Sequence, residues 1–164
     1  MRRLSLIVLS VLVVVAGCGT ATVTTTQPLT GDRPRPDRVI VQDFGVNAPA
    51  DERRDGQAVA KTLTDTLITT LSDHGIDAFH TSATPLPGAR TASILGEVVY
   101  VPGGQEIRAR IQVYQGAGSN TRLIAEMEVN TPRSLIPGTD ARRTAEAVAA
   151  RIGEFYRRQG WPWR

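Results

Sequence analysis

Residues 107–113 read Ile-Arg-Ala-Arg-Ile-Gln-Val, in which apolar and polar side chains alternate at every position. The neighbouring segments 94–100 and 123–129 alternate in a similar way, and turn-forming residues separate the three at 102–105 and 116–120. A period of two places apolar side chains on one face of a strand and polar side chains on the other. The pattern predicts a three-stranded antiparallel meander with one buried face and one charged face.

Charged residues on this meander indicate how its strands pair; they are Glu97, Arg108, Arg110, Glu126 and Glu128. Pairing about the second turn places Arg110 opposite Glu126 and Arg108 opposite Glu128, and pairing about the first turn places Glu97 opposite Arg110. Each cross-strand contact of opposite charges contributes a few tenths of a kcal/mol. A slip of one residue would bury the charges. We therefore expect a Glu97–Arg110–Glu126 row on the outer face.

Two amphipathic helices flank the meander in sequence. Residues 57–74 place apolar side chains within one arc, and Gly75 ends this helix with Ile76 packing back on its last turn. A second helix begins at Thr139 or Asp140 and ends at Gly160. Its apolar arc consists of Ala141, Ala145, Val148, Ala149, Ile152, Phe155 and Tyr156.

Two further strands are expected before the meander, at residues 39–44 and 76–81. The apolar run at 39–41 is typical of a central strand that is covered on both faces. A helix between two strands favours a parallel crossover. The predicted fold class is an α/β two-layer sandwich, in the order strand, helix, four strands, helix, with a mixed sheet and both helices on one face.

The N-terminal segment has the pattern of a lipoprotein signal. Arg2 and Arg3 precede an apolar run, and Val-Ala-Gly leads into Cys18, the only cysteine. This pattern predicts a signal peptide over 1–17 and a diacylglycerol on the Cys18 thiol. The alternative is a signal peptide or membrane span with an incidental cysteine. Residues 18–37 are rich in Thr, Pro and Gly and are expected to form a flexible tether, followed by a single α/β domain over 38–164.

The net charge and the cysteine content argue against several classes of function. The formal charge of +3 falls to +1 once Arg2 and Arg3 are removed, so nucleic acid is not an expected partner. With Cys18 lipidated, the mature domain has neither a disulfide nor a thiolate metal site. Gly19 stands where an aspartate would favour retention in an inner membrane, so an outer membrane is the expected destination. No cofactor is expected.

Several short motifs resemble those of a family of bacterial lipoproteins built on one small domain of unknown function. They are the strand at 39–44, Gly75-Ile76, Leu95-Gly96-Glu97, an arginine in the strand before the hairpin, Gly116-Ala117-Gly118-Ser119 and Gln159-Gly160-Trp161. The family's fold is similar to the N-terminal domain of TolB and to the envelope lipoproteins CsgG and LpoB. The resemblance spans 38–161 and implies an envelope accessory domain without assigned catalytic residues. It departs from the family at 113–115, where relatives are richer in glycine.

Few residues are candidates for catalysis or metal binding. Asp43, His74 and His80 each lack a partner nearby in the sequence that would complete a catalytic or metal site. Trp161 is expected to pack on the last helix, and Trp163 either does the same or anchors a partner.

The sequence therefore favours a non-enzymatic outer-membrane lipoprotein with a periplasmic interaction domain. Its expected contacts are the membrane, through the lipid on Cys18, and an envelope protein or peptidoglycan-associated partner. The candidate interaction surface comprises Glu97, Arg108, Arg110, Glu126, Glu128 and Trp163. The alternative is a lipoprotein that binds a ligand or lipid for transport, which requires an apolar cavity. An enzyme is the least supported class.

Overall fold

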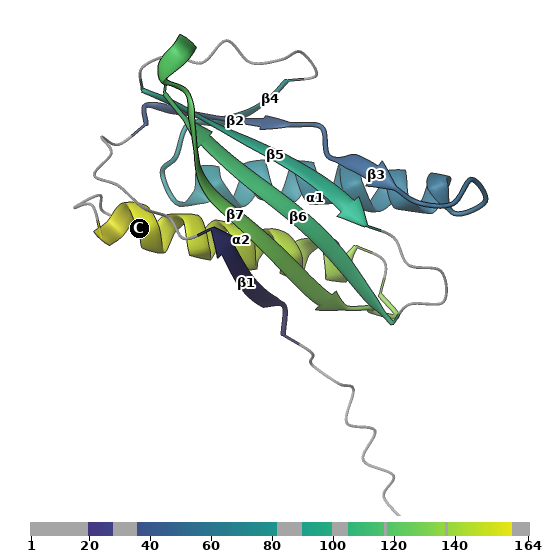
Figure 1. Ribbon diagram of the computed structural model, residues 1–164. Coiled ribbons are helices and arrows are strands. Elements are labelled where there is room, and N and C mark those ends of the chain that lie inside the picture. Colours follow the sequence, from purple (N-terminus) through teal and green to yellow (C-terminus); the bar gives the residue numbers. More distant parts are fainter. Residues whose placement is uncertain are drawn as a thin grey trace, which may run out of the picture.

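The computed structural model of the chain describes residues 20–27, 36–81, 90–99, 105–116, 118–136 and 138–158. Two helices lie on one face of a seven-stranded sheet, as Figure 1 shows. The elements are β1 (Thr22–Gln27), β2 (Arg38–Gln42), β3 (Gly45–Asn47), α1 (Arg53–Asp73), β4 (Ala78–Thr81), β5 (Thr91–Val99), β6 (Glu106–Gln115), a 3-10 turn (Gly118–Asn120), β7 (Arg122–Pro132) and α2 (Thr139–Arg158). This arrangement confirms the predicted two-layer α/β sandwich. In the described part of the chain, neither helix combines the length and the apolar character of a membrane span.

The strands follow the order β1-β7-β6-β5-β2-β4, and β3 also pairs with β5. The unit β2-α1-β4 is parallel, as expected, and β5, β6 and β7 form the predicted antiparallel meander. β2 is an interior strand, but the helices cover only one of its faces. Val39 and Val41 belong to the core under the helices, whereas Ile40 points to the other face and is still only 8% exposed.

A strand that the sequence did not predict lies within the expected tether. β1 pairs antiparallel with β7, with Val23 opposite Val129, and Val23 packs against the core. Five of the six residues of β1 are Thr or Val, whose β-branched side chains favour an extended backbone. The pairing also satisfies backbone groups of β7 that would otherwise form an open edge. The prediction of a flexible tether is therefore wrong for residues 22–27.

The end of α1 confirms the predicted helix stop. Gly75 has a φ of +77°, in the left-handed region that glycine adopts without strain. Its N–H donates to the carbonyl of Ser72 at 2.9 Å, and the Ile76 N–H donates to the carbonyl of Leu71 at 3.1 Å. This is a Schellman motif, and the buried Ile76 side chain packs back on the helix. α1 begins at Arg53, four residues before the predicted start at Gln57.

The apolar arc predicted for α2 is entirely buried. Alanines on this arc and on the strands beneath it, among them Ala145 and Ala109, are fully buried and allow close helix–sheet contact. Two polar pairs lie within this core. The hydroxyls of Thr131 and Thr144 are 2.7 Å apart, and the Tyr156 hydroxyl donates to Gln115 Oε1 at 3.1 Å.

Tyr156 makes the fold sensitive to alkali. Burial raises the pKa of its phenol above the usual value near 10. The unfolded chain therefore releases this proton before the folded protein does, so stability falls as the pH rises above the unfolded-state pKa. We expect Tyr156→Phe to cost about 1–2 kcal/mol at neutral pH, through the lost hydrogen bond to Gln115. Between about pH 9 and pH 12, urea unfolding should show a smaller loss of stability for the variant than for the wild type. Parallel curves would contradict this role.

The β6–β7 register differs from the predicted one by two residues. Arg110 lies opposite Glu128 and not Glu126, and Arg108 lies opposite Asn130. The shift is even, so the charged side chains stay on the face that the helices leave open. The predicted pairings of Arg110 with Glu126 and of Arg108 with Glu128 are wrong, although the predicted faces are correct.

Two features of the hairpin cause this difference of two residues. Next to the turn, Gln115 pairs with Arg122, which is one residue away from a pairing symmetric about Gly118, and a bulge in β7 adds the second residue. The register changes next to Tyr114, which pairs with Leu123, so that Ile124 is an extra residue in β7. Such a bulge shifts all pairs beyond it and turns the neighbouring residue to the other face. Leu123, predicted to face the core, therefore lies with Tyr114 on the open face. Beyond the bulge, Ile111 lies opposite Met127, and both are fully buried as expected.

Candidate functional site

Three charged residues form a row across the open face of the sheet. Glu97 on β5, Arg110 on β6 and Glu128 on β7 are direct cross-strand neighbours. The first of these pairings, Glu97 with Arg110, is the one that the sequence predicts correctly. Within the described chain, none of the three side chains forms an ion pair or hydrogen bond. Their charges are thus available to another molecule.

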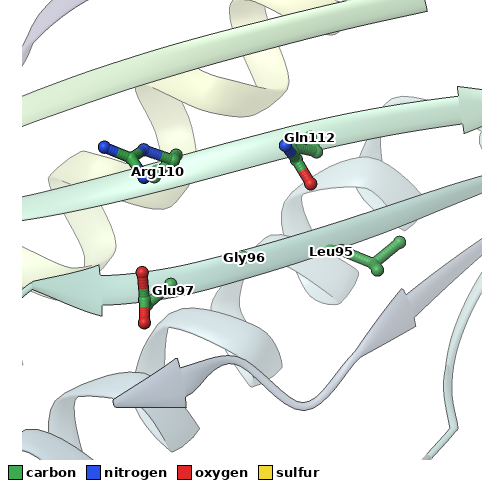
Figure 2. A pocket seen from close by; sticks show the side chains of 5 residues that line it. All are labelled: Leu95, Gly96, Glu97, Arg110 and Gln112. Carbon is green, nitrogen blue, oxygen red and sulfur yellow. The ribbon is translucent and has the colours of Figure 1, made fainter. Parts of the chain in front are cut away.

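A shallow pocket of about 240 Å³ lies along this row. Figure 2 shows the residues that line it, Leu95, Gly96, Glu97, Arg110 and Gln112, on the neighbouring strands β5 and β6. The Glu97 carboxylate and the Arg110 guanidinium lie at one end of the pocket, and the Leu95 and Gln112 side chains lie at the other. The site therefore combines both signs of charge with one apolar side chain and one amide.

Gly96 lines the pocket through its backbone, and the position of its missing side chain faces the core on the other side of the sheet. A Cβ at this position would come within 2.5 Å of the Phe44 ring, which packs against the glycine backbone. Phe44 is buried, so the ring has no space into which it could withdraw. The core thus requires glycine here.

The remaining charged residues of the predicted surface are engaged locally. Arg108 forms an ion pair with Glu106 on its own strand, at 2.9 Å. Gln112 Nε2 donates to Glu126 Oε1 at 3.1 Å, and the Tyr114 hydroxyl donates to Gln112 Oε1 at 3.3 Å. These bonds orient the polar side chains around the pocket, and they leave the Arg110 guanidinium without a hydrogen bond or ion pair in the described chain.

The structure joins two residues that the sequence left separate. Asp43 follows β2 and His80 lies on the neighbouring parallel strand β4, and Asp43 Oδ1 is 2.6 Å from His80 Nε2. The sequence analysis missed this pair because the two residues are 37 positions apart and only the β2–β4 register brings them together. His74, in contrast, lies at the end of α1 as expected, where its backbone N–H donates to helix carbonyls.

A second pocket, of about 370 Å³, surrounds the Asp43–His80 pair. Lys61 in this pocket forms a 2.8 Å ion pair with Asp65, and the hydrogen bond to Asp65 raises the Lys61 pKa. Its amine is therefore held protonated and is a poor base or nucleophile. The Thr64 hydroxyl donates to the carbonyl of Ala60 and is buried. The pair thus has a histidine and an acid but no activated nucleophile beside them.

The remaining predictions concern a metal site and the two ends of the chain. In the described residues, no group of three or more His, Cys, Asp or Glu side chains is placed to hold a metal ion. Cys18, the signal segment, Trp161 and Trp163 lie outside the residues that the structure describes.

The chain matches no protein-family model and no curated protein sequence. Solved structures with a similar fold include two of a PelC dodecamer from Paraburkholderia phytofirmans, both 16% identical over 80% of this chain and 96% of that chain. Their TM-scores are 0.53 for PelC and 0.52 for a variant of PelC with one substituted residue.

Weaker matches are protein XCC0632 from Xanthomonas campestris, of the DUF330 family, and TolB from Acinetobacter baumannii. XCC0632 is 13% identical over 83% of this chain and 94% of that chain, with a TM-score of 0.44. TolB is 11% identical over 83% of this chain and 31% of that chain, with a TM-score of 0.38. The likeness to PelC shows a fold that other bacterial proteins share.

Proposed function

We propose that the chain is a lipid-anchored accessory protein of the bacterial envelope that binds a protein partner on the open face of its sheet. The observation that carries the proposal is the row Glu97, Arg110 and Glu128, whose charges have no partner within the described chain. Charges at an interface favour one partner over others and guide its approach. A row of alternating charge beside an apolar side chain is suited to a complementary protein surface.

The N-terminal sequence pattern supports the proposed location at the outer membrane, facing the periplasm. A basic start, an apolar run and a small-residue approach to Cys18 favour export and lipidation, and Gly19 favours the outer membrane. The domain then faces the periplasm, where a peptidoglycan-associated partner is also within reach. The slight net charge argues against nucleic acid.

The pocket around Asp43 and His80 supports a non-enzymatic role better than a catalytic one. The Asp43 and His80 side chains are 63% and 45% exposed, which leaves the pair in water. Efficient general acid–base groups are usually placed beside a reacting group in a site that excludes water. The Thr64 hydroxyl and the Lys61 amine, which lie near this pair, are already engaged.

Photo-crosslinking in cells tests the proposed surface. We expect p-benzoylphenylalanine in place of Leu95, in the open-face pocket, to form a covalent adduct with a protein of the envelope. The matched control carries the same residue in place of Thr69, which is exposed on α1. An adduct from Thr69 alone, or from neither position, would contradict binding through the open face.

A further inference from the structure

We infer that the loop between β7 and α2 contacts the membrane that holds the lipid anchor, by inserting Leu135 and Ile136 into its surface. This inference rests on the proposed lipidation of Cys18. Leu135 is 103% exposed and Ile136 is 67% exposed. Among the described residues, the only other large apolar side chain that is exposed is Phe79, at 37%. Two adjacent apolar side chains in water are unusual for a protein whose core is otherwise well covered.

The anchor and the loop lie at the same end of the sheet. β1 begins at Thr22, which is opposite Asn130 near the end of β7, and the loop follows directly after Pro132 (Figure 1). Cys18 is only four residues before Thr22. An extended chain spans at most about 3.6 Å per residue, so the lipidated residue lies within about 14 Å of the start of β1. The pairing of β1 thus holds this end of the domain near the membrane.

Local bonds hold the loop in a defined shape. The Ile136 N–H donates to Ser134 Oγ at 3.1 Å, and the Thr139 N–H donates to the carbonyl of Ile136 at 3.2 Å. Gly138, with a φ of +77°, turns the chain into α2. The loop therefore presents its apolar side chains on a structured turn, which lowers the entropy lost on insertion.

The charges beside the loop bear on whether its membrane contact depends on anionic lipid headgroups. Arg133 lies 4.0 Å from the nearly buried Asp140, so its charge is largely balanced. Attraction to anionic headgroups is therefore not required, and apolar insertion into zwitterionic lipid is sufficient. The acyl chains on Cys18 already supply affinity. The contribution of the loop is a second contact point, which fixes the orientation of the domain and leaves the open face accessible beside the membrane.

Site-specific fluorescence on the mature lipidated protein tests this inference. Because lipidation consumes the Cys18 thiol, Leu135→Cys provides the reactive thiol for the environment-sensitive dye NBD. The matched control is Arg157→Cys, which is exposed near the far end of α2, about 27 Å along the helix from its start. The proteins are reconstituted in protein-free phosphatidylcholine vesicles, with and without lipids that carry a doxyl quencher in the acyl chain.

We expect the dye at position 135 to shift to shorter wavelength and to be quenched by the doxyl lipid, and the dye at position 157 to do neither. Vesicle-bound protein with an unquenched, water-exposed dye at 135 would overturn the inference while leaving the lipid anchor intact. A blue-shifted dye that the doxyl lipid does not quench would assign the loop to a second copy of the chain, and would also overturn it. Absence of the diacylglycerol from Cys18 by intact mass would overturn both the anchor and the inference.

Discussion

Replacement of Cys18 by serine should abolish lipidation and leave an uncleaved precursor or a soluble protein. Each methylene of an acyl chain contributes about 0.8 kcal/mol to membrane binding, so two long chains contribute on the order of 20 kcal/mol. A loop with two apolar side chains cannot replace a contribution of this size. The effect on the amount of mature, membrane-bound protein should therefore be close to complete.

Intact mass and fractionation of washed envelopes measure this effect, with Thr20→Ser as the matched control. The control should be processed, lipidated and retained like the wild type, because Thr20 follows the proposed cleavage site and precedes β1. Unchanged retention of Cys18→Ser in washed envelopes, with the mature mass, would contradict the lipoprotein interpretation.

Truncation of Ile111 to alanine should produce the largest loss of stability on the meander. Ile111 is fully buried on the interior strand β6, between Gly96 on β5 and Met127 on β7. Removing its side chain loses apolar burial and leaves a cavity under the helices, at a cost of about 2–5 kcal/mol. The neighbouring Arg110→Ala, on the open face, should cost about 0–1 kcal/mol.

Urea unfolding of the two variants measures both values under identical conditions. The pair of substitutions tests the strand faces directly, since the two residues are adjacent and lie on opposite faces of the same strand. Equal and small losses for both would show that the meander does not bury Ile111 as described.

The sequence predicted the faces of the meander better than its register. Side-chain alternation alone places Ile111 in the core and Arg110 outside, because it depends only on the period of the strand. The pairing of Arg110 depends also on the bulge at Ile124, and no residue there differs visibly from an ordinary strand. A glycine does mark the turn: Gly116 has a φ of +129°, and a Cβ there would lie 2.3 Å from the Asn120 carbonyl oxygen.

Two features depended on distant pairing and could not be predicted from local patterns. β1 is a short segment of Thr and Val whose structure comes from pairing with β7, far later in the chain. The Asp43–His80 pair similarly requires the β2–β4 register. The local composition of β1 was equally compatible with a loop, whereas the two strands that hold Asp43 and His80 were predicted and only their register was not.

Complementation of a deletion strain tests most directly whether the open face is the functional surface. One variant, Arg108→Glu with Arg110→Glu, reverses the positive charges of the open face. The other variant, Asp43→Asn with His80→Gln, removes the hydrogen-bonded histidine–acid pair. Thermal melting of each purified protein shows that it is folded. We predict that the face variant fails to complement and that the Asp43–His80 variant complements fully. The reverse result, with both proteins folded, would contradict the account and indicate a catalytic or metal site around His80.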